Sequence, residues 1–431
     1  MANILFAKIG LKIPKTMFGK EGFKEGYDDD IRLLINLAYN NPDDTFYIIG
    51  NNSFDDLHPK DKTRLFPNNN VVNAYDFGKY GEPDRYKIPM EYLEENQISV
   101  DYGIVNMGPI LNRNIPNLTK LKDGVGFAKT LASAKNYVAP IIHTLNCTGV
   151  RWVALCDDPR CMKGAFDLFN VPPIVLSQIN SNLEYEHITS YEDHTVITSE
   201  VEVKYAMVES SVVLDEDVSF VDENWENRES NFNIALNGGI NTETKTWVSK
   251  YSNKTSPERR YELVKEWALD IFPDVSVYGK WGDDILKESN FMGSVTRSEL
   301  YGLMSGWKHS LCIPIKREWS TAKYLEYLKT GVSPFLHPYY DSQGNTQMPD
   351  FYRVDSPDEL LDKINMDCSV HIENLNSAIS LCLDDKYTSG QYLTDLIYEN
   401  LGIERDIKNK NRKLWKVKKT SATSGLDAFF S

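Results

Sequence analysis

Short apolar segments that alternate with amphipathic stretches constrain the fold of this chain more than any other feature. Such segments occur at Ile4–Ala7, Phe46–Ile49 and Tyr102–Val105, and the pattern begins again at Phe232–Leu236. Buried strands separated by helical stretches are typical of layered α/β domains with parallel sheets. The sequence therefore predicts the α/β class.

The length indicates more than one domain. A chain of 431 residues exceeds the size of one ordinary hydrophobic core. Residues 222–231 are polar and mark a boundary, so we predict a first domain at 1–228, a second at 229–404, whose last helix can pack back on the first domain, and a distinct segment at 405–431. We expect two Rossmann-like domains that face each other across a cleft, with ligands at the carboxyl ends of the strands.

The composition restricts the class of protein. Hydrophobic residues make up 41% of the chain and aromatic residues 12%, which is ample for a folded core. The net charge of −15 argues against a generally basic nucleic-acid binder, although it leaves room for a local basic surface. The six cysteines lack paired C-x-x-C spacing, and no apolar run is long enough to cross a bilayer. We expect reduced thiols, no metal site, no membrane and a cytoplasmic location.

One segment of the second domain carries a glutamate at each end of a predicted helix start. In Glu318–Glu326, either Ser320 or Thr321 can cap the helix, and Gly331 suits the position after its end. Free N–H groups at a helix N-terminus, with Lys323 beside them, suit a diphosphate. Carboxylates on both sides suit the hydroxyls of a sugar and a ribose, so the segment predicts a nucleotide-sugar site.

Three further segments belong with this one. Asn237-Gly238-Gly239 follows a predicted strand, with Lys245 downstream, while Tyr278–Trp281 and Met292–Val295 follow or include later strands. Together with the E-x7-E spacing of Glu318–Glu326, they resemble the donor domain of retaining glycosyltransferases of the GT-B fold, over about residues 232–340. The family usually has an arginine where this chain has Gly239. That difference implies that the diphosphate is bound in an altered way, or that Arg259 or Lys323 contributes the positive charge.

The resemblance implies roles for individual residues. Glu326 would accept hydrogen bonds from the donor ribose, and Glu318 would hold the transferred sugar and stabilise positive charge on its anomeric carbon. Lys323 and Lys245 would neutralise the leaving diphosphate. Either lysine can instead be a surface residue, and Glu318 can pair with a neighbouring cation. The remaining predicted donor-binding residues are Ser320, Thr321, Gly238, Gly239 and Gly10.

The acceptor side is predicted from the first domain. Asp157-Asp158-Pro159-Arg160 follows the apolar segment that ends at Cys156. One aspartate can orient or deprotonate an acceptor hydroxyl, and Arg160 can contact a DNA phosphate. The same residues can equally form a plain Asp-Pro turn.

The C-terminal segment differs in kind from the rest of the chain. Residues 405–419 are strongly basic, and this stretch can contact phosphates or act as a solvated linker. The chain ends Gly425–Ser431, in which Leu426, Phe429 and Phe430 form an apolar motif suited to a partner's groove. This motif is similar to those with which replication proteins of T-even-like phages bind the sliding clamp.

The chain resembles the DNA glycosyltransferases of T-even-like phages in three segments: the predicted helix Thr321–Gly331, the segment Cys156–Arg160 and the C-terminal motif. The resemblance implies transfer of glucose or arabinose from a UDP donor to 5-hydroxymethylcytosine in double-stranded DNA, with retention, without an obligatory metal, in the host cytoplasm. Such a modification protects phage DNA from host nucleases. Two other readings stay open: a GT-B glycosyltransferase acting on a cell-surface glycan, and a non-catalytic DNA-binding protein tethered to the clamp.

Overall fold

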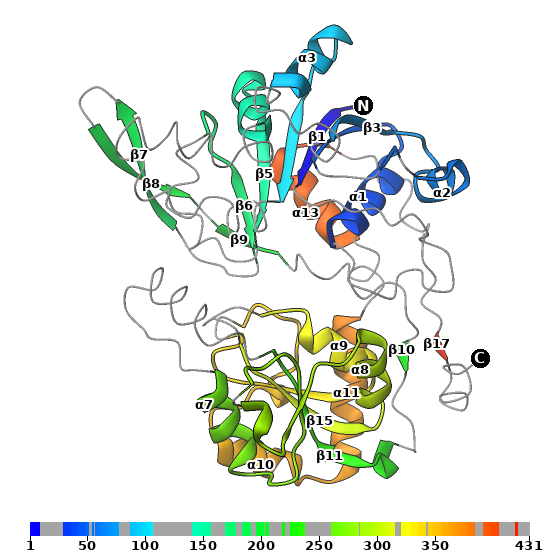
Figure 1. The fold of residues 1–431 in the computed structure, drawn as a ribbon, viewed down its shortest axis with the longest axis vertical. Helices are drawn as coiled ribbons and strands as arrows, with labels where there is room; N and C mark the ends of the chain where they lie inside the picture. Colours follow the sequence, from blue (N-terminus) through cyan, green and yellow to red (C-terminus); the bar gives the residue numbers. More distant parts are fainter. Residues whose placement is uncertain are drawn as a thin grey trace. The chain divides into compact units, whose positions relative to one another are not determined.

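The computed structural model forms two compact units (Figure 1). It describes residues 1–8, 29–50, 54–55, 57–76, 87–106, 140–156, 169–177, 183–190, 195–201, 203–206, 218–219, 225–237, 260–283, 285–314, 320–341, 344–383, 391–404 and 419–420. The first unit comprises Met1–Phe23, Tyr27–Ser211 and Ser389–Leu414, and the second comprises Lys24–Gly26, Val212–Thr388 and Trp415–Ser431.

A seven-stranded parallel sheet organises the first unit, in the order β3-β2-β1-β4-β5-β6-β9. Its strands are β1 (Asn3–Lys8), β2 (Thr45–Gly50), β3 (Val71–Asp76), β4 (Tyr102–Asn106), β5 (Arg151–Cys156), β6 (Ile174–Ser177) and β9 (Val203–Tyr205). The order 3-2-1-4-5-6 is that of the Rossmann fold. A separate antiparallel hairpin, β7 (Leu183–Ser190) and β8 (Thr195–Val201), lies between β6 and β9 in sequence.

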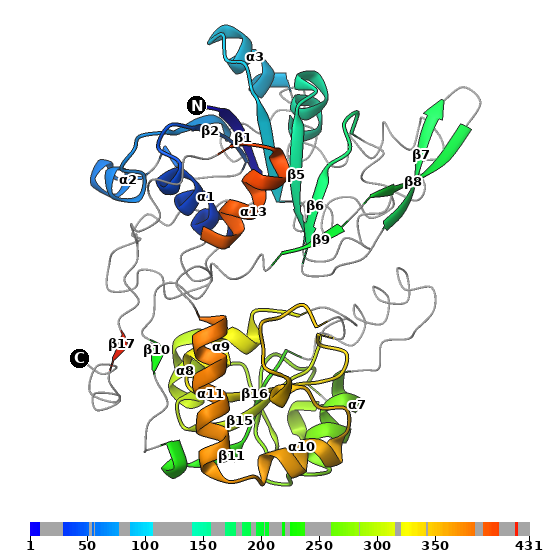
Figure 2. The ribbon, with the colours of Figure 1, turned by 180° about the vertical axis from the view of Figure 1, so that it is seen from behind.

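The helices of this unit include one from the far end of the chain. Its described helices are α1 (Asp29–Asn40), α2 (Pro59–Leu65), α3 (Ile88–Glu95), residues 140–148 and α13 (Gln391–Leu401). The Tyr398 hydroxyl of α13 donates to Oδ2 of Asp44 at 2.8 Å, and Nζ of Lys204 donates to Oδ1 of Asn400 at 2.8 Å. The helix α13 lies beside α1 in both ribbon views (Figure 2). The chain therefore returns to its first unit before it ends.

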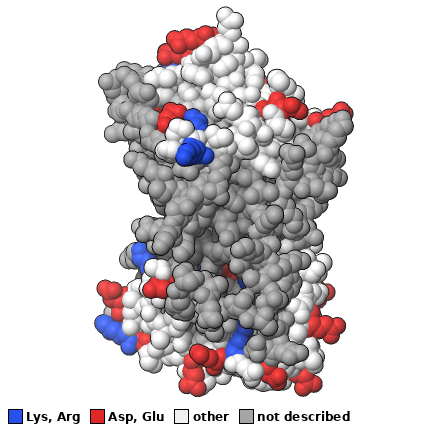
Figure 3. Space-filling model, turned by 90° about the vertical axis from the view of Figure 1, so that its right-hand side faces the viewer, with Lys and Arg blue, Asp and Glu red and all other residues white. Residues whose placement is uncertain are grey.

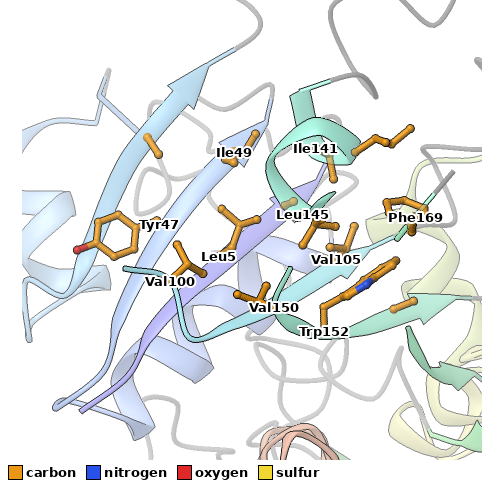
Figure 4. Packing of buried hydrophobic residues seen from close by; sticks show 14 of the residues in the cluster. Leu5, Tyr47, Ile49, Val100, Val105, Ile141, Leu145, Val150, Trp152 and Phe169 are labelled. Atoms are coloured by element: carbon orange, nitrogen blue, oxygen red, sulfur yellow. The ribbon is translucent and has the colours of Figure 1, made fainter. Parts of the chain in front are cut away.

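A dense apolar core covers one face of this sheet (Figure 4). Leu5, Val105 and Trp152 from neighbouring strands pack with Ile141 and Leu145 of the helical stretch 140–148. All five side chains are buried, and the indole N–H of Trp152 finds a backbone acceptor at 2.7 Å. Alternate side chains of parallel strands bury in this way when helices cover the sheet.

The second unit is also built on parallel strands, in a smaller sheet. Its strands are β11 (Ser230–Phe232), β12 (Ile234–Ala235), β13 (Val277–Tyr278), β14 (Phe291–Gly293), β15 (Trp307–Cys312) and β16 (Ser333–Leu336). The parallel sets β12-β13-β14 and β11-β15-β16 meet at Asn233, whose N–H donates to the His309 carbonyl at 3.3 Å. Its side-chain Oδ1 accepts from the N–H of Ser276 at 2.8 Å. Asn233 thus joins β11 and β12 into one interrupted strand. The strand order of the whole sheet is then β14-β13-β12/β11-β15-β16, which is that of a Rossmann-like sheet.

Helices surround this second sheet. They are α7 (Arg260–Val264), which continues as the π-helical turn η7 (Lys265–Leu269), α8 (Arg297–Met304), α9 (Lys323–Lys329), α10 (Pro357–Ile364) and α11 (Cys368–Cys382). Short 3-10 turns occur at η6 (Trp225–Asn227), η8 (Ile285–Lys287) and η9 (Asp350–Tyr352), and β10 (Val218–Ser219) pairs with β17 (Lys419–Thr420). A capping box of Thr296 and Glu299 begins α8. The predicted α/β class with two Rossmann-like units is confirmed.

Two buried histidines of the second unit predict sensitivity to acid. The rings of His309 on β15 and His371 on α11 lie 4.4 Å apart, and each residue is at most 2% exposed. Burial is the main cause that lowers both pKa values below 6.5, and Lys308 and Arg228 lower that of His309 further. The unfolded chain then binds protons first on acidification, so stability is lost as the pH falls below about 6.5. We expect the free energy of unfolding to be lower at pH 5.5 than at pH 7, measured by urea unfolding at both pH values.

The control for this prediction is a buried residue that does not titrate between pH 5.5 and pH 7. The variant His371→Leu should reduce the dependence of unfolding free energy on pH, while Tyr352→Phe should leave it unchanged, because burial raises the pKa of Tyr352 far above that range. Equal dependence in His371→Leu and the unmodified protein would contradict the prediction.

Candidate functional site

The candidate site lies at the point in the second sheet where the order of successive strands reverses. The interrupted strand β11–β12 is the first of the unit, and its two neighbours, β13 and β15, lie on opposite sides of it. In doubly wound sheets, ligands bind outside the carboxyl ends of the strands at this topological switch point. Here those ends lead into Asn237, Gly279 and the residues after Cys312.

A tyrosine closes the gap that opens between the first and fourth strands. β15 pairs with β11 but not with β12, so the backbone of Ala235 lacks a neighbouring strand on that side. The Tyr327 hydroxyl accepts from the Ala235 N–H at 2.9 Å and donates to the Ala235 carbonyl at 3.3 Å. Burial raises the pKa of Tyr327 well above its usual range, which keeps the hydroxyl protonated. The side chain thus fixes α9 to the end of β12.

The start of α9 differs from the prediction. Ser320 or Thr321 was expected to cap the helix, but Ala322 is the N-cap residue and no side chain caps the first turn. The physical reason is a competing tertiary contact: the hydroxyl and the carbonyl of Thr321 both bond to the hydroxyl of Tyr340. The Thr321 hydroxyl still accepts a long 3.4 Å bond from the N–H of Lys323. With seven residues α9 is short, and its N-terminus binds an anion less strongly than that of a longer helix would.

The end of α9 is as predicted. Gly331 adopts φ +71°, and its N–H donates to the Leu328 carbonyl at 3.0 Å, while the Val332 N–H reaches the Tyr327 carbonyl at 2.9 Å. This pair of bonds is a Schellman motif. The Arg228 guanidinium donates to the carbonyls of Thr330 and Gly331 at 3.1 and 2.8 Å, and its charge complements the helix C-terminus.

The two donor-binding residues predicted on α9 contact each other. The Lys323 ammonium forms a salt bridge with Oε2 of Glu326, one helical turn away. Their side chains are 27% and 17% exposed, so both are half-buried and still reachable. Cys312, at the carboxyl end of β15, lies close enough for both charges to act on its thiol. The pair therefore sits beside the switch point.

Arg260 is a candidate that sequence analysis missed. As the first residue of α7, it donates through Nη1 to the Asn237 carbonyl, where the chain leaves β12. Its Nε and Nη2 are buried and have no hydrogen-bond partner among the described residues. Burial lowers the pKa of this guanidinium to about 10. The prediction had named the neighbouring Arg259, which lies outside the described residues, and only the fold shows which arginine is buried.

A close backbone packing holds the strand ends together. The Asn237 side chain accepts from the N–H of Lys280 at 2.8 Å, and the N–H of Gly279 donates to the Gly293 carbonyl at 2.8 Å. Gly279 has φ +149°, and a Cβ atom there would lie 2.1 Å from the Leu236 carbonyl oxygen. The predicted segments after β13 and β14 are thereby brought beside the Asn237 segment.

Comparisons with known proteins add similarities of fold. No protein-family model matches the chain, and no curated protein matches it. Among solved structures the chain is similar to T4 phage β-glucosyltransferase in complex with UDP-glucose, with 11% identity and a TM-score of 0.48 over 94% of this chain and 100% of that one. It is also similar to Anabaena HepE in complex with UDP-glucose, with 11% identity and a TM-score of 0.46 over 93% and 100%. A third similar structure is an O-GlcNAc transferase mutant of Thermobaculum terrenum, with 9% identity and a TM-score of 0.46 over 93% of this chain and 67% of that one.

Several predicted site residues lie outside the described part of the chain and stay predictions. They are Gly10, Asp157, Asp158, Arg160, Gly238, Gly239, Lys245, Glu318, Leu426, Phe429 and Phe430. Of the predicted residues, the structure describes Ser320 and Thr321 just before α9 and Lys323 and Glu326 on it, and Arg260 is a further candidate. Within the described ranges, no helix could span a membrane, and no group of three or more His, Cys, Asp or Glu side chains is placed to hold a metal ion.

Proposed function

We propose that this chain is a glycosyltransferase that takes a sugar from a UDP donor. The observation that supports this most strongly is the Arg260 guanidinium at the carboxyl end of the first strand, two of whose nitrogens are buried and have no hydrogen-bond partner among the described residues. The Lys323–Glu326 pair stands on α9, which Tyr327 joins to the same strand two residues before Asn237. Two cations and a carboxylate at a switch point are the groups that a nucleoside diphosphate needs.

Each group has a chemical task in this proposal. Arg260 and Lys323 neutralise the diphosphate as it leaves, which is the main electrostatic demand of glycosyl transfer. Glu326 accepts hydrogen bonds from the ribose hydroxyls, a bidentate task that suits a carboxylate. Lys323 then exchanges its salt bridge with Glu326 for a phosphate oxygen. The predicted Glu318 would hold the transferred sugar.

We propose 5-hydroxymethylcytosine in double-stranded DNA as the acceptor, with glucose or arabinose as the sugar and retention through front-face attack assisted by the donor phosphate. The support is in the sequence: Asp157 or Asp158 as the base, Arg160 and the basic residues 405–419 for phosphates, and the clamp-like tail. On the face in Figure 3, described Lys and Arg side chains form separate small groups among acidic ones, not one basic area. Arg160 and almost all of residues 405–419, which are proposed for the DNA contact, lie outside the described ranges. We further propose that transfer needs no metal.

The decisive experiment is transfer itself. The protein is incubated with UDP-glucose or UDP-arabinose and with duplex DNA that contains either 5-hydroxymethylcytosine or cytosine, with and without EDTA. Mass spectrometry of the released nucleosides should show a glycosylated product only from hydroxymethylated DNA, unaffected by EDTA. Transfer to neither DNA would overturn the proposed acceptor. If UDP also failed to bind, the proposed donor would be overturned as well.

Glu326 gives this experiment a matched pair of variants. The substitution Glu326→Gln should weaken UDP binding about 10-fold to 100-fold, because charged hydrogen bonds contribute roughly 1.5–3 kcal/mol. Glu359→Gln is the control, since Glu359 on α10 also pairs with a lysine, Lys363, at 2.8 Å. Calorimetric titration with UDP measures both, and equal affinities would remove Glu326 from the site.

A further inference from the structure

A second buried tyrosine holds the entry to α9. Tyr340 follows β16 in sequence and is fully buried. Its hydroxyl donates to the Thr321 carbonyl and lies 3.1 Å from the Thr321 hydroxyl. One phenol thus fixes both the main chain and the side chain of the residue just before the N-cap, Ala322.

The same hydroxyl reaches a third segment. Its single proton goes to the Thr321 carbonyl, so its oxygen is left to accept from the thiol of Cys312 at the carboxyl end of β15; burial raises the pKa of that thiol. The backbone reinforces the link, because the Tyr340 N–H donates to the His337 carbonyl at 2.8 Å and the His337 N–H donates to the Cys312 carbonyl at 3.2 Å. Tyr340 therefore ties together the end of β15, the loop after β16 and the entry to α9.

The body of α9 is held by other groups. Tyr327 joins it to Ala235, and Arg228 binds its last carbonyls. Loss of the Tyr340 hydroxyl would therefore release the entry and leave Lys323 and Glu326 on an anchored helix. The two ends of the site segment have separate anchors.

We propose that Tyr340 is a positioning residue for the sugar end of the donor, whereas Tyr327 positions the nucleotide end. The inference rests on the proposed function. The entry residues 320–322 follow the predicted sugar-binding Glu318 in sequence, separated only by Trp319. A reacting group displaced by about 1 Å loses rate without a matching loss of remote binding.

The test separates turnover from nucleotide affinity. Tyr340→Phe should lower kcat about 10-fold to 100-fold and change the Kd for UDP by less than about 2-fold. Tyr327→Phe should instead weaken UDP binding about 10-fold, because the loss of both Tyr327–Ala235 hydrogen bonds lets α9, which carries Lys323 and Glu326, move away from the end of β12. The control is Tyr352→Phe, another fully buried tyrosine of this unit, whose hydroxyl has one long bond among the described residues, 3.4 Å from the Ser333 hydroxyl; this variant should leave both constants unchanged.

Each outcome decides the matter. An unchanged kcat in Tyr340→Phe, or a rise in the Kd for UDP that matches the fall in kcat, would overturn the proposal. Hydrogen exchange provides a readout that does not need activity: peptides that contain residues 320–322 should exchange about 10-fold faster in Tyr340→Phe than in Tyr352→Phe. A wild type that neither binds UDP nor transfers sugar would overturn the proposed function alone, whereas equal exchange in these two variants would overturn the anchoring by Tyr340.

Discussion

Replacing Arg260 with alanine is expected to lower kcat for sugar transfer about 100-fold to 1,000-fold. The reason is electrostatic: a donor preorganised toward developing charge in a water-poor site contributes ~3–4 kcal/mol to the transition state. Two guanidinium nitrogens of Arg260 are buried without a partner among the described residues, so they are available to the leaving diphosphate. Arg260→Lys keeps the charge but loses the planar fork, and should fall between the wild type and Arg260→Ala. Steady-state kinetics with the UDP-sugar measure all three.

Stability distinguishes this role from a structural one. Burial lowers the pKa of Arg260 to about 10, which means that the folded state disfavours the charge it carries at neutral pH. Removal of that charge should leave the midpoint of thermal unfolding unchanged or raise it, and UDP should stabilise Arg260→Ala less than the wild type. A lower midpoint with unchanged kcat would show that Arg260 only supports the fold.

Arg353 is the contrasting arginine of the same unit. Its Nη1 lies 2.7 Å from Oδ2 of the buried Asp341, so Arg353→Ala would leave a buried carboxylate without its cation. We expect that variant to lose about 3 kcal/mol of unfolding free energy. The pair of variants therefore separates a guanidinium held for a ligand from one held for the fold.

Strand positions could be predicted because burial leaves a mark in the sequence. The apolar segments at Ile4–Ala7 and Phe46–Ile49 lie inside β1 and β2, since parallel strands covered on both faces read as continuous apolar runs. The segment Phe232–Leu236 contains one polar residue, Asn233, and the strand is interrupted there. That interruption depends on partners at His309 and Ser276, which no local pattern reveals.

The site could be predicted only where local chemistry decides it. Gly331 ends α9 because a left-handed residue is needed there, and glycine is the usual solution. The start of α9 could not be predicted, because Thr321 is bound by Tyr340 from a later loop. Arg260 was missed for the same reason: its burial and its contact with Asn237, 23 residues earlier, arise only in the folded unit.

The largest expected effect on stability comes from Gly279→Ala. At φ +149° an L side chain is strained, and the new Cβ would lie 2.1 Å from the Leu236 carbonyl oxygen and 3.1 Å from the Asn237 nitrogen. Both neighbours are backbone, so the contact can be relieved only if the ends of β12 and β13 separate. Strain of ~1–3 kcal/mol and overpacking of a similar size predict a loss of about 4 kcal/mol. Denaturant unfolding, with its midpoint and slope, measures this loss.

Gly302→Ala is the matched control, because the same methyl group should act there in the opposite direction. Gly302 lies within α8, and a Cβ at this position meets nothing within 4 Å. Alanine in a helix interior is favoured over glycine by roughly 0.5–1 kcal/mol, so this variant should be more stable than the wild type. A stable Gly279→Ala would show that the ends of β12 and β13 are not packed as described. Since the same packing places Asn237 and Arg260, it would also remove the geometric support for the diphosphate site.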